Sequence, residues 1–149
     1  MQRLNFPKFQ FRLKKTKDDL TLIFDEIRKK WLQLTPEEWV RQHWISFLTQ
    51  ELGTPNQLIA TEVGININTR KKRSDVLVYK DSKVILIIEC KRSAVAISQK
   101  TLDQILIYNK NYFSKYLVLS NGISHKFFMI NYDEKKITEL NELPSYIKM

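Results

Sequence analysis

Two carboxylates and a lysine lie at the ends of neighbouring apolar segments. Asp75 precedes the apolar residues 76–79, and Glu89 and Lys91 end the apolar segment 84–91. Acidic groups beside a buried strand are unfavourable unless they are paired or bind metal. The two carboxylates and the backbone carbonyl of Cys90 are hard oxygen ligands of the kind that Mg²⁺ or Mn²⁺ prefers. A lysine beside them can orient or deprotonate a water and offset charge that grows on a phosphoryl oxygen.

The register of the hairpin that joins these segments decides whether the three side chains can meet. A three-residue loop at 81–83 pairs Lys80 with Val84 and sets Asp75 opposite Glu89. A two-residue loop instead sets Asp75 opposite Ile88 and turns Glu89 to the other face, unless a bulge restores the parity. The alternative to a metal site is a salt bridge between Glu89 and its lysine neighbour, with Asp75 only starting a strand.

Further polar residues could complete the site. Gln104 and Tyr108 are four residues apart on a predicted helix, so their side chains are neighbours, although an ordinary polar helix face has the same pattern. Glu37 falls beside the apolar stripe of an earlier helix and could point at the site. Glu38 has the capping-box position, which indicates a structural role. Glu62, in the middle of a predicted strand, could serve as the additional acid in place of Glu37.

The helix that carries the first of these acids has a clear start and a clear end. Thr35 is the expected N-cap, Pro36 stands at the first helical position, and Glu38 follows three residues after the cap. A stripe of mainly apolar residues continues to position 51. Gly53 and Pro55 then end the helix.

The rest of the chain predicts strands and one more helix. Segments 58–68, 75–79 and 84–91 are strand-like, Ser98 caps a helix that reaches about residue 111, and strands follow at 116–120, 127–132 and, more weakly, 137–140. Both faces of the central hairpin are apolar: one carries Leu77, Tyr79, Ile85 and Ile87, and the other carries Val76, Val78, Val84, Leu86 and Ile88. The pattern predicts an α/β fold whose mixed sheet is flanked by helices on both faces.

The N-terminal residues are less clearly patterned. Phe9, Phe11 and Leu13 alternate with polar residues as in a half-buried strand, and Pro7 favours an edge position. The amphipathic stretch 20–34 fits no element clearly. We expect one domain over residues 1–149, made of an N-terminal extension (1–34) and a core (35–144).

Positive charge suggests a polyanionic partner. The chain of 149 residues carries 25 Lys and Arg against 16 Asp and Glu, a formal net charge of +9. The excess gathers at Lys14, Lys15 and Lys17, at Arg28, Lys29 and Lys30, and at Arg70, Lys71, Lys72 and Arg73. Such clusters favour nucleic acid through the release of counterions, and the last cluster is the expected contact. A merely solvated basic surface is the alternative.

Several classes of protein are not indicated. Cys90 is the single cysteine, so no internal disulfide and no zinc-ligand spacing exist, which fits a reducing compartment. The longest aliphatic run, 84–88, is too short to cross a membrane, and no secretory signal is evident. No phosphate-binding loop of an ATP-driven motor occurs. We expect a cytoplasmic protein.

These motifs together resemble a known nuclease group. Ser74-Asp75, Glu89-Cys90-Lys91 and Gln104-x-x-x-Tyr108 are similar to the PD-(D/E)xK nuclease superfamily and to the Q-x-x-x-Y helix of its RecB-like branch. More narrowly, segments 34–42, 72–75 and 116–122 resemble the N-terminal domain of type I restriction enzyme R subunits. The resemblance spans about 35–144.

The resemblance implies a restriction-endonuclease-like fold with a defined site. Asp75 and Glu89 would bind Mg²⁺, Lys91 would be the catalytic lysine, and Gln104 and Tyr108 would support the site near DNA. Ser74 stands where the superfamily pattern has proline. The helicase motor that follows this domain in full subunits is not in the sequence, so ATP-driven translocation is not implied.

Our hypothesis is a DNA endonuclease or phosphodiesterase that depends on Mg²⁺ or Mn²⁺. The alternatives are a nucleic-acid-binding module whose site is intact but idle, and a partner-binding domain with no nucleic-acid role. The expected partners are DNA and other restriction-system subunits. A homo-oligomer is left open, and no membrane partner is expected.

Overall fold

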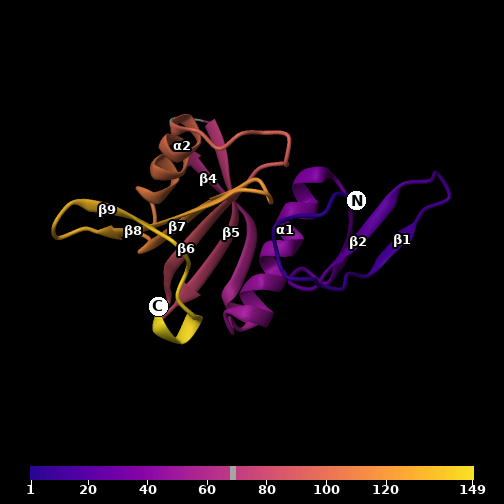
Figure 1. Ribbon diagram of the computed structural model, residues 1–149, viewed down its shortest axis with the longest axis horizontal. Helices are drawn as coiled ribbons and strands as arrows, with labels where there is room; N and C mark the ends of the chain where they lie inside the picture. Colours follow the sequence, from indigo (N-terminus) through magenta and orange to yellow (C-terminus); the bar gives the residue numbers. More distant parts are fainter. Residues whose placement is uncertain (68–69) are drawn as a thin grey trace.

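The computed structural model describes residues 1–67 and 70–149, and it describes side chains over 1–61 and 75–149. Near the N-terminus, β1 (Leu13–Lys15), β2 (Thr21–Asp25) and β3 (Lys30–Gln33) form a small antiparallel sheet. Helix α1 (Pro36–Ser46) and a π-helical turn (Phe47–Glu51) follow. Figure 1 shows α1 between the β1–β2 hairpin and the larger sheet.

The larger sheet has six strands in sequence order. After a short 3-10 turn (Asn56–Leu58), the strands are β4 (Ile59–Ile67), β5 (Arg70–Lys80), β6 (Lys83–Cys90), β7 (Tyr116–Ser120), β8 (His125–Asn131) and β9 (Lys136–Leu140). Neighbouring strands are antiparallel except β6 and β7, which are parallel and are connected through α2 (Gln99–Asn109). A second 3-10 turn (Tyr146–Lys148) lies near the C-terminus. The predicted mixed sheet is confirmed.

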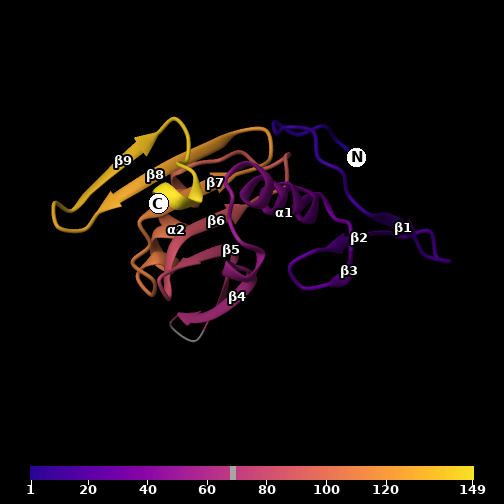
Figure 2. The same cartoon turned by 90° about the horizontal axis from the view of Figure 1, so that it is seen from below.

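The two helices cover opposite faces of this sheet. Val40 and Trp44 of α1 pack against a buried cluster that includes Val76 and Ile88. Ile105 of α2 belongs to a second cluster, with Leu77, Ile87 and Leu117. Because successive residues of a strand point to opposite faces, the apolar runs of β5 and β6 supply both clusters. Figure 2 shows the arrangement from below.

The turn between β5 and β6 is the two-residue alternative and not the three-residue loop. Lys80 pairs with Lys83, which leaves Asp81 and Ser82 as a two-residue turn. Both turn residues have positive φ, at 52° and 63°, as a type I′ turn requires. The three-residue loop is therefore not formed. A two-residue turn without a bulge would set Asp75 opposite Ile88.

A bulge in β6 restores the register that a three-residue loop would give. Tyr79 pairs with Val84 but Val78 pairs with Leu86, so Ile85 is the extra residue. Beyond the bulge Val76 pairs with Ile88, and the next step of this register sets Asp75 level with Glu89.

The bulge also exchanges the faces of two residues. Val84 packs in the cluster under α2, and Ile85 packs against the cluster under α1. The faces predicted for these two residues were therefore wrong, because the prediction assumed an unbroken alternation along β6.

The N-terminal segment also differs from the prediction. Phe9 and Phe11 lie outside any strand, and their rings pack near α1, where Phe11 is 5.0 Å from Trp39 between ring centroids. The untyped stretch 20–34 forms the β2–β3 hairpin. No helix in the described part of the chain has the length and apolar character needed to cross a membrane.

Candidate functional site

The candidate site lies where β5 and β6 meet. Asp75 and Glu89 are 8% and 5% exposed, so both carboxyl groups are buried. Asp75 Oδ2 accepts a hydrogen bond from the backbone N–H of Cys90, at 2.7 Å. The side chain of one strand is thus held by the backbone of the next. The thiol of Cys90 is fully buried and its pKa is raised by that burial, so the thiol is a packing group.

Glu89 has one paired oxygen and one unpaired oxygen. Its Oε1 lies 3.1 Å from the Nζ of Lys91, whereas its buried Oε2 has no hydrogen-bond partner among the described residues. Burial, followed by the negative charge of Asp75, raises the pKa of Glu89 to about 7. A buried carboxylate oxygen without a donor is costly, so this oxygen is free to accept a hydrogen bond or to bind a cation.

Lys91 is held in its charged form. Burial alone would lower its pKa, but the contact with Glu89 and the charge of Asp75 outweigh burial and raise it. The side chain is 29% exposed, so its ammonium group can still be reached from solvent. At neutral pH this group is a hydrogen-bond donor and a positive charge.

Arg41 is a site residue that the sequence interpretation missed. It is 4% exposed, and its guanidinium donates to Asp75 Oδ1 at 2.9 Å and to Glu38 Oε1 at 2.5 Å. Burial alone would lower the pKa of Arg41, but Glu38 and Asp75 raise it on balance, so the group stays charged. The available signal was its spacing, because Arg41 follows Glu37 and Glu38 by four and three residues on one helix.

Glu38 joins the site to the small N-terminal sheet. Its carboxylate is buried and accepts hydrogen bonds from Arg41 and, at 3.0 Å, from Gln42 Nε2. The same amide group donates to Asp25 Oδ2 at 3.0 Å, and Asp25 pairs with Arg28 at 2.9 Å. Arg28 in turn lies 3.6 Å from Glu38. A buried chain of polar groups, linked by hydrogen bonds and ion pairs, therefore connects the end of β2 to the candidate site.

Glu37 and Glu38 make different contacts. The N–H of Glu38 donates to Thr35 Oγ1 at 3.1 Å, as expected of a helix N-cap, but the Glu38 carboxylate turns to Arg41. Glu37 lies 3.5 Å from Arg41. Burial and the charge of Asp75 raise the pKa of Glu37, which indicates that it shares the electrostatic environment of the site.

The roles of all the predicted site residues stay predictions, and the remaining candidates lie as follows. Gln104 is half-buried and Tyr108 is buried on α2, the helix that covers the opposite face of the sheet from α1. The side chain of Glu62 lies outside the described residues. The same holds for the side chains of the basic cluster Arg70, Lys71, Lys72 and Arg73, whose backbone forms the start of β5.

The donor set fits a hard divalent cation. Each carboxylate oxygen has two lone pairs, so the contacts of Asp75 with Arg41 and Cys90 leave acceptor capacity on both of its oxygens. Glu89 adds an oxygen with no donor. Among the residues described, no three or more His, Cys, Asp or Glu side chains gather as a metal cage. Mg²⁺ usually keeps several waters and needs only one or two carboxylates, so two suffice.

A solved structure with a similar fold is known. It is a fragment described as an HsdR subunit of a type I restriction enzyme from Vibrio vulnificus YJ016, with a TM-score of 0.53 and 20% sequence identity. The match covers 75% of this chain and 24% of that chain, so the present chain corresponds to about a quarter of the other protein. At this identity the likeness concerns the fold.

The sequence itself matches a family description. Residues 36–144 match the family described as the type I restriction enzyme R protein N terminus. No curated protein matches the chain. The matched segment contains α1, α2 and the whole six-stranded sheet, whereas the small N-terminal sheet precedes it. This chain therefore belongs to the family of type I restriction enzyme R protein N-terminal domains.

Proposed function

We propose that the chain is a DNA phosphodiesterase of the PD-(D/E)xK type that depends on Mg²⁺ or Mn²⁺. Asp75, Glu89 and the backbone carbonyl of Cys90 would hold the ion. The observation that carries the proposal is the buried Oε2 of Glu89, which has no hydrogen-bond donor among the described residues. The charge of a second carboxylate, that of Asp75, also acts on Glu89. A divalent cation would satisfy this oxygen and offset both negative charges.

The chain's own residues have separate tasks in this proposal. When bound, the ion would supply Lewis-acid polarisation of the phosphate and activation of a water. Lys91 is protonated at neutral pH, so it donates to the phosphate oxygens and stabilises the negative charge that develops there. Arg41 and the Cys90 N–H hold the Asp75 carboxylate in place. Glu37, Gln104 and Tyr108 are proposed to support the site near the DNA.

Family membership and charge support the proposed partners. The chain belongs to the N-terminal family of restriction enzyme R proteins and has a formal net charge of +9. DNA is the expected substrate, with contacts from Arg70, Lys71, Lys72 and Arg73, because basic clusters bind phosphates with release of counterions. Other restriction-system subunits in the cytoplasm are the proposed protein partners.

A second candidate function is a DNA-binding module without catalysis. One observation favours it: the buried guanidinium of Arg41 already contacts Asp75 and compensates part of its charge. If this contact satisfies Asp75 well enough, a cation gains less by binding. The two candidates make opposite predictions about cleavage.

Cleavage of DNA distinguishes them. Supercoiled, linear and single-stranded DNA would each be incubated with the protein in Mg²⁺, in Mn²⁺ and in EDTA. We expect metal-dependent cleavage that Lys91→Ala lowers by roughly a hundredfold or more while DNA binding stays nearly unchanged, because Lys91 acts on transition-state charge. Lys136→Ala, at an exposed lysine of β9, is the matched control and should cut normally.

Two results would contradict the nuclease proposal. Equal cleavage by the wild type and the Lys91→Ala variant would remove Lys91 from the chemistry. Metal-independent binding without cleavage in any of the three conditions would favour the second candidate.

A further inference from the structure

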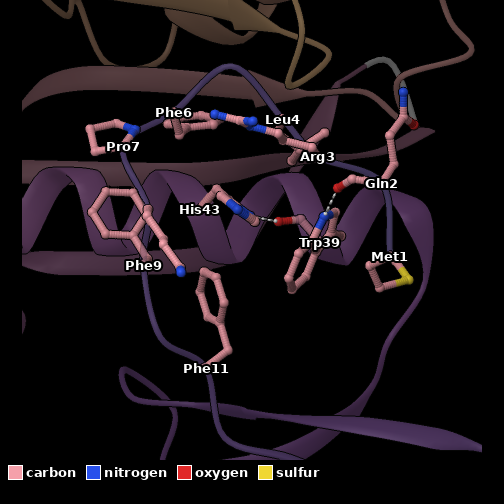
Figure 3. Close-up of a pocket in the computed structure, with 11 residues that line it drawn as sticks. Met1, Gln2, Arg3, Leu4, Phe6, Pro7, Phe9, Phe11, Trp39 and His43 are labelled. Atoms are coloured by element: carbon pink, nitrogen blue, oxygen red, sulfur yellow. Dashed lines mark hydrogen bonds between the residues drawn. The ribbon is translucent and has the colours of Figure 1, made fainter.

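An aromatic pocket lies against α1, apart from the carboxylates. It has a volume of about 510 Å³ and is formed by most of the N-terminal residues 1–11 (all but Asn5 and Gln10) together with Trp39 and His43. Figure 3 shows Phe9, Phe11, Trp39 and His43 around it. The N-terminal wall precedes the segment that matches the family, 36–144, so it lies outside the matched region.

The rings of this pocket form a connected aromatic wall. Centroid distances are 4.4 Å from Trp39 to His43 and 4.8 Å from Phe11 to His43. Phe9, Phe11 and Trp39 are only half-buried, so part of each ring remains accessible. His43 is buried and its Nδ1 donates to the Trp39 carbonyl at 2.8 Å. Burial lowers the pKa of His43, so the ring is neutral at pH 7.

The rim of the pocket is positive. Arg3 and Lys8 are exposed lining residues, and no carboxylate occurs among the residues that line the pocket. An aromatic cage for a cationic ligand would not carry cations at its edge, because they repel the ligand. A flat aromatic ligand attached to negative groups fits both features.

The pocket adjoins the chain segment that follows the candidate site. Trp39 and Gln2 also line a neighbouring hollow whose other residues include Pro36, Arg92 and Ser93. Arg92 follows Lys91 directly, and Pro36 precedes Glu37. A single strand of DNA that occupies both hollows would therefore pass beside the segment that carries Lys91.

We propose that this pocket binds an unpaired base of single-stranded DNA. Phe9, Phe11 and Trp39 would stack on the base, while Arg3 and Lys8 contact the flanking phosphates. The proposal rests on the proposed function only in taking DNA as the ligand. It adds a substrate preference, because a base that is paired and stacked in a duplex cannot enter an aromatic pocket.

A fluorescent base tests this placement without any cleavage. A short single-stranded oligonucleotide with one 2-aminopurine, whose emission falls when the base stacks, would be titrated with protein in EDTA. We expect quenching with the single strand and little with its duplex. Phe9→Leu and Phe11→Leu should each weaken single-strand binding at least about fivefold, because stacking on one aromatic ring contributes about that much or more.

One control variant, one rim variant and one altered oligonucleotide keep the test independent of folding. Phe113→Leu changes an aromatic residue that is 69% exposed outside the pocket and should leave binding unchanged. Lys8→Gln changes only the exposed rim, so it should fold normally and make binding less sensitive to salt. An oligonucleotide with an abasic site in place of the probe base should bind more weakly to the wild type.

Defined results would overturn the proposal. Equal affinity for the abasic and the complete oligonucleotide would exclude a base in the pocket. A changed oligomeric state in Phe9→Leu and Phe11→Leu, with unchanged DNA binding, would make the pocket a contact between copies. Quenching by a protein that never cuts DNA would support the pocket and refute the nuclease, whereas cleavage without quenching would do the reverse.

Discussion

Glu89 is buried beside Asp75, and this placement makes its ionisation unfavourable in the protein without metal. Its pKa is raised from 4.5 to about 7. The folded state binds this proton more tightly than the unfolded chain does. The contribution of Glu89 to the free energy of unfolding is therefore fully present below pH 4.5 and is lost as the pH rises through about 7. A bound cation reverses the preference, since it favours the ionised carboxylate.

Glu89→Gln should therefore remove a pH-dependent loss of stability. In EDTA, the free energy of unfolding of the wild type should fall between about pH 5 and pH 8 by as much as about 3 kcal/mol on account of Glu89. The variant should lack this component, which urea unfolding at both pH values measures. Glu139→Gln, at a side chain 57% exposed, is the control. Identical pH profiles for the wild type and Glu89→Gln would contradict the account.

Sequence reasoning identified Asp75, Glu89 and Lys91 because acids and a lysine at the ends of apolar strands are unusual. Their proximity depends on a bulge at Ile85 that no residue type announces, so the sequence left the register open. Arg41 was missed because an arginine within a polar helix turn usually faces water. Its contact with Glu38 is local, but its burial also depends on the contact with Asp75, which is distant in sequence.

At the scale of elements, the two helices and the central strands were predictable, because capping residues and apolar runs are local signals. The N-terminal part was not. Phe9 and Phe11 alternate like strand residues, but their rings pack around His43 instead, at 6.2 Å and 4.8 Å between centroids. Tertiary packing decided this segment. The β2–β3 hairpin likewise depends on Asp25, whose Oδ1 accepts the N–H groups of Ile27 and Arg28.

Asp25 should stabilise the small sheet and the contact of this sheet with α1. Asp25→Ala removes a fully buried carboxylate that bonds Arg28 and Gln42, so the free energy of unfolding should fall by about 3 kcal/mol. Glu26→Ala, at a neighbouring side chain 51% exposed, should cost less than about 1 kcal/mol. Urea unfolding measures both variants. Equal losses would show that the buried chain of polar groups does not join the sheet to the site.

At the scale of the whole molecule, the charge of +9 should govern the approach to DNA. Neutralising Arg70, Lys71 and Lys72 together should weaken DNA binding and reduce the slope of log affinity against log salt by as much as about 3. Fluorescence anisotropy over a series of salt concentrations measures this slope. A triple variant with unchanged affinity and slope would place the DNA surface elsewhere on the molecule.

Titration calorimetry of the metal-free protein with Mn²⁺ tests the proposed site most directly. The account predicts saturable binding by the wild type, its loss in Glu89→Gln, and normal binding in Glu139→Gln. Binding should also raise the melting temperature of the wild type through ligand linkage. Absence of binding by the wild type, or equal affinity in Glu89→Gln, would contradict the claim that the buried Glu89 oxygen is a metal ligand.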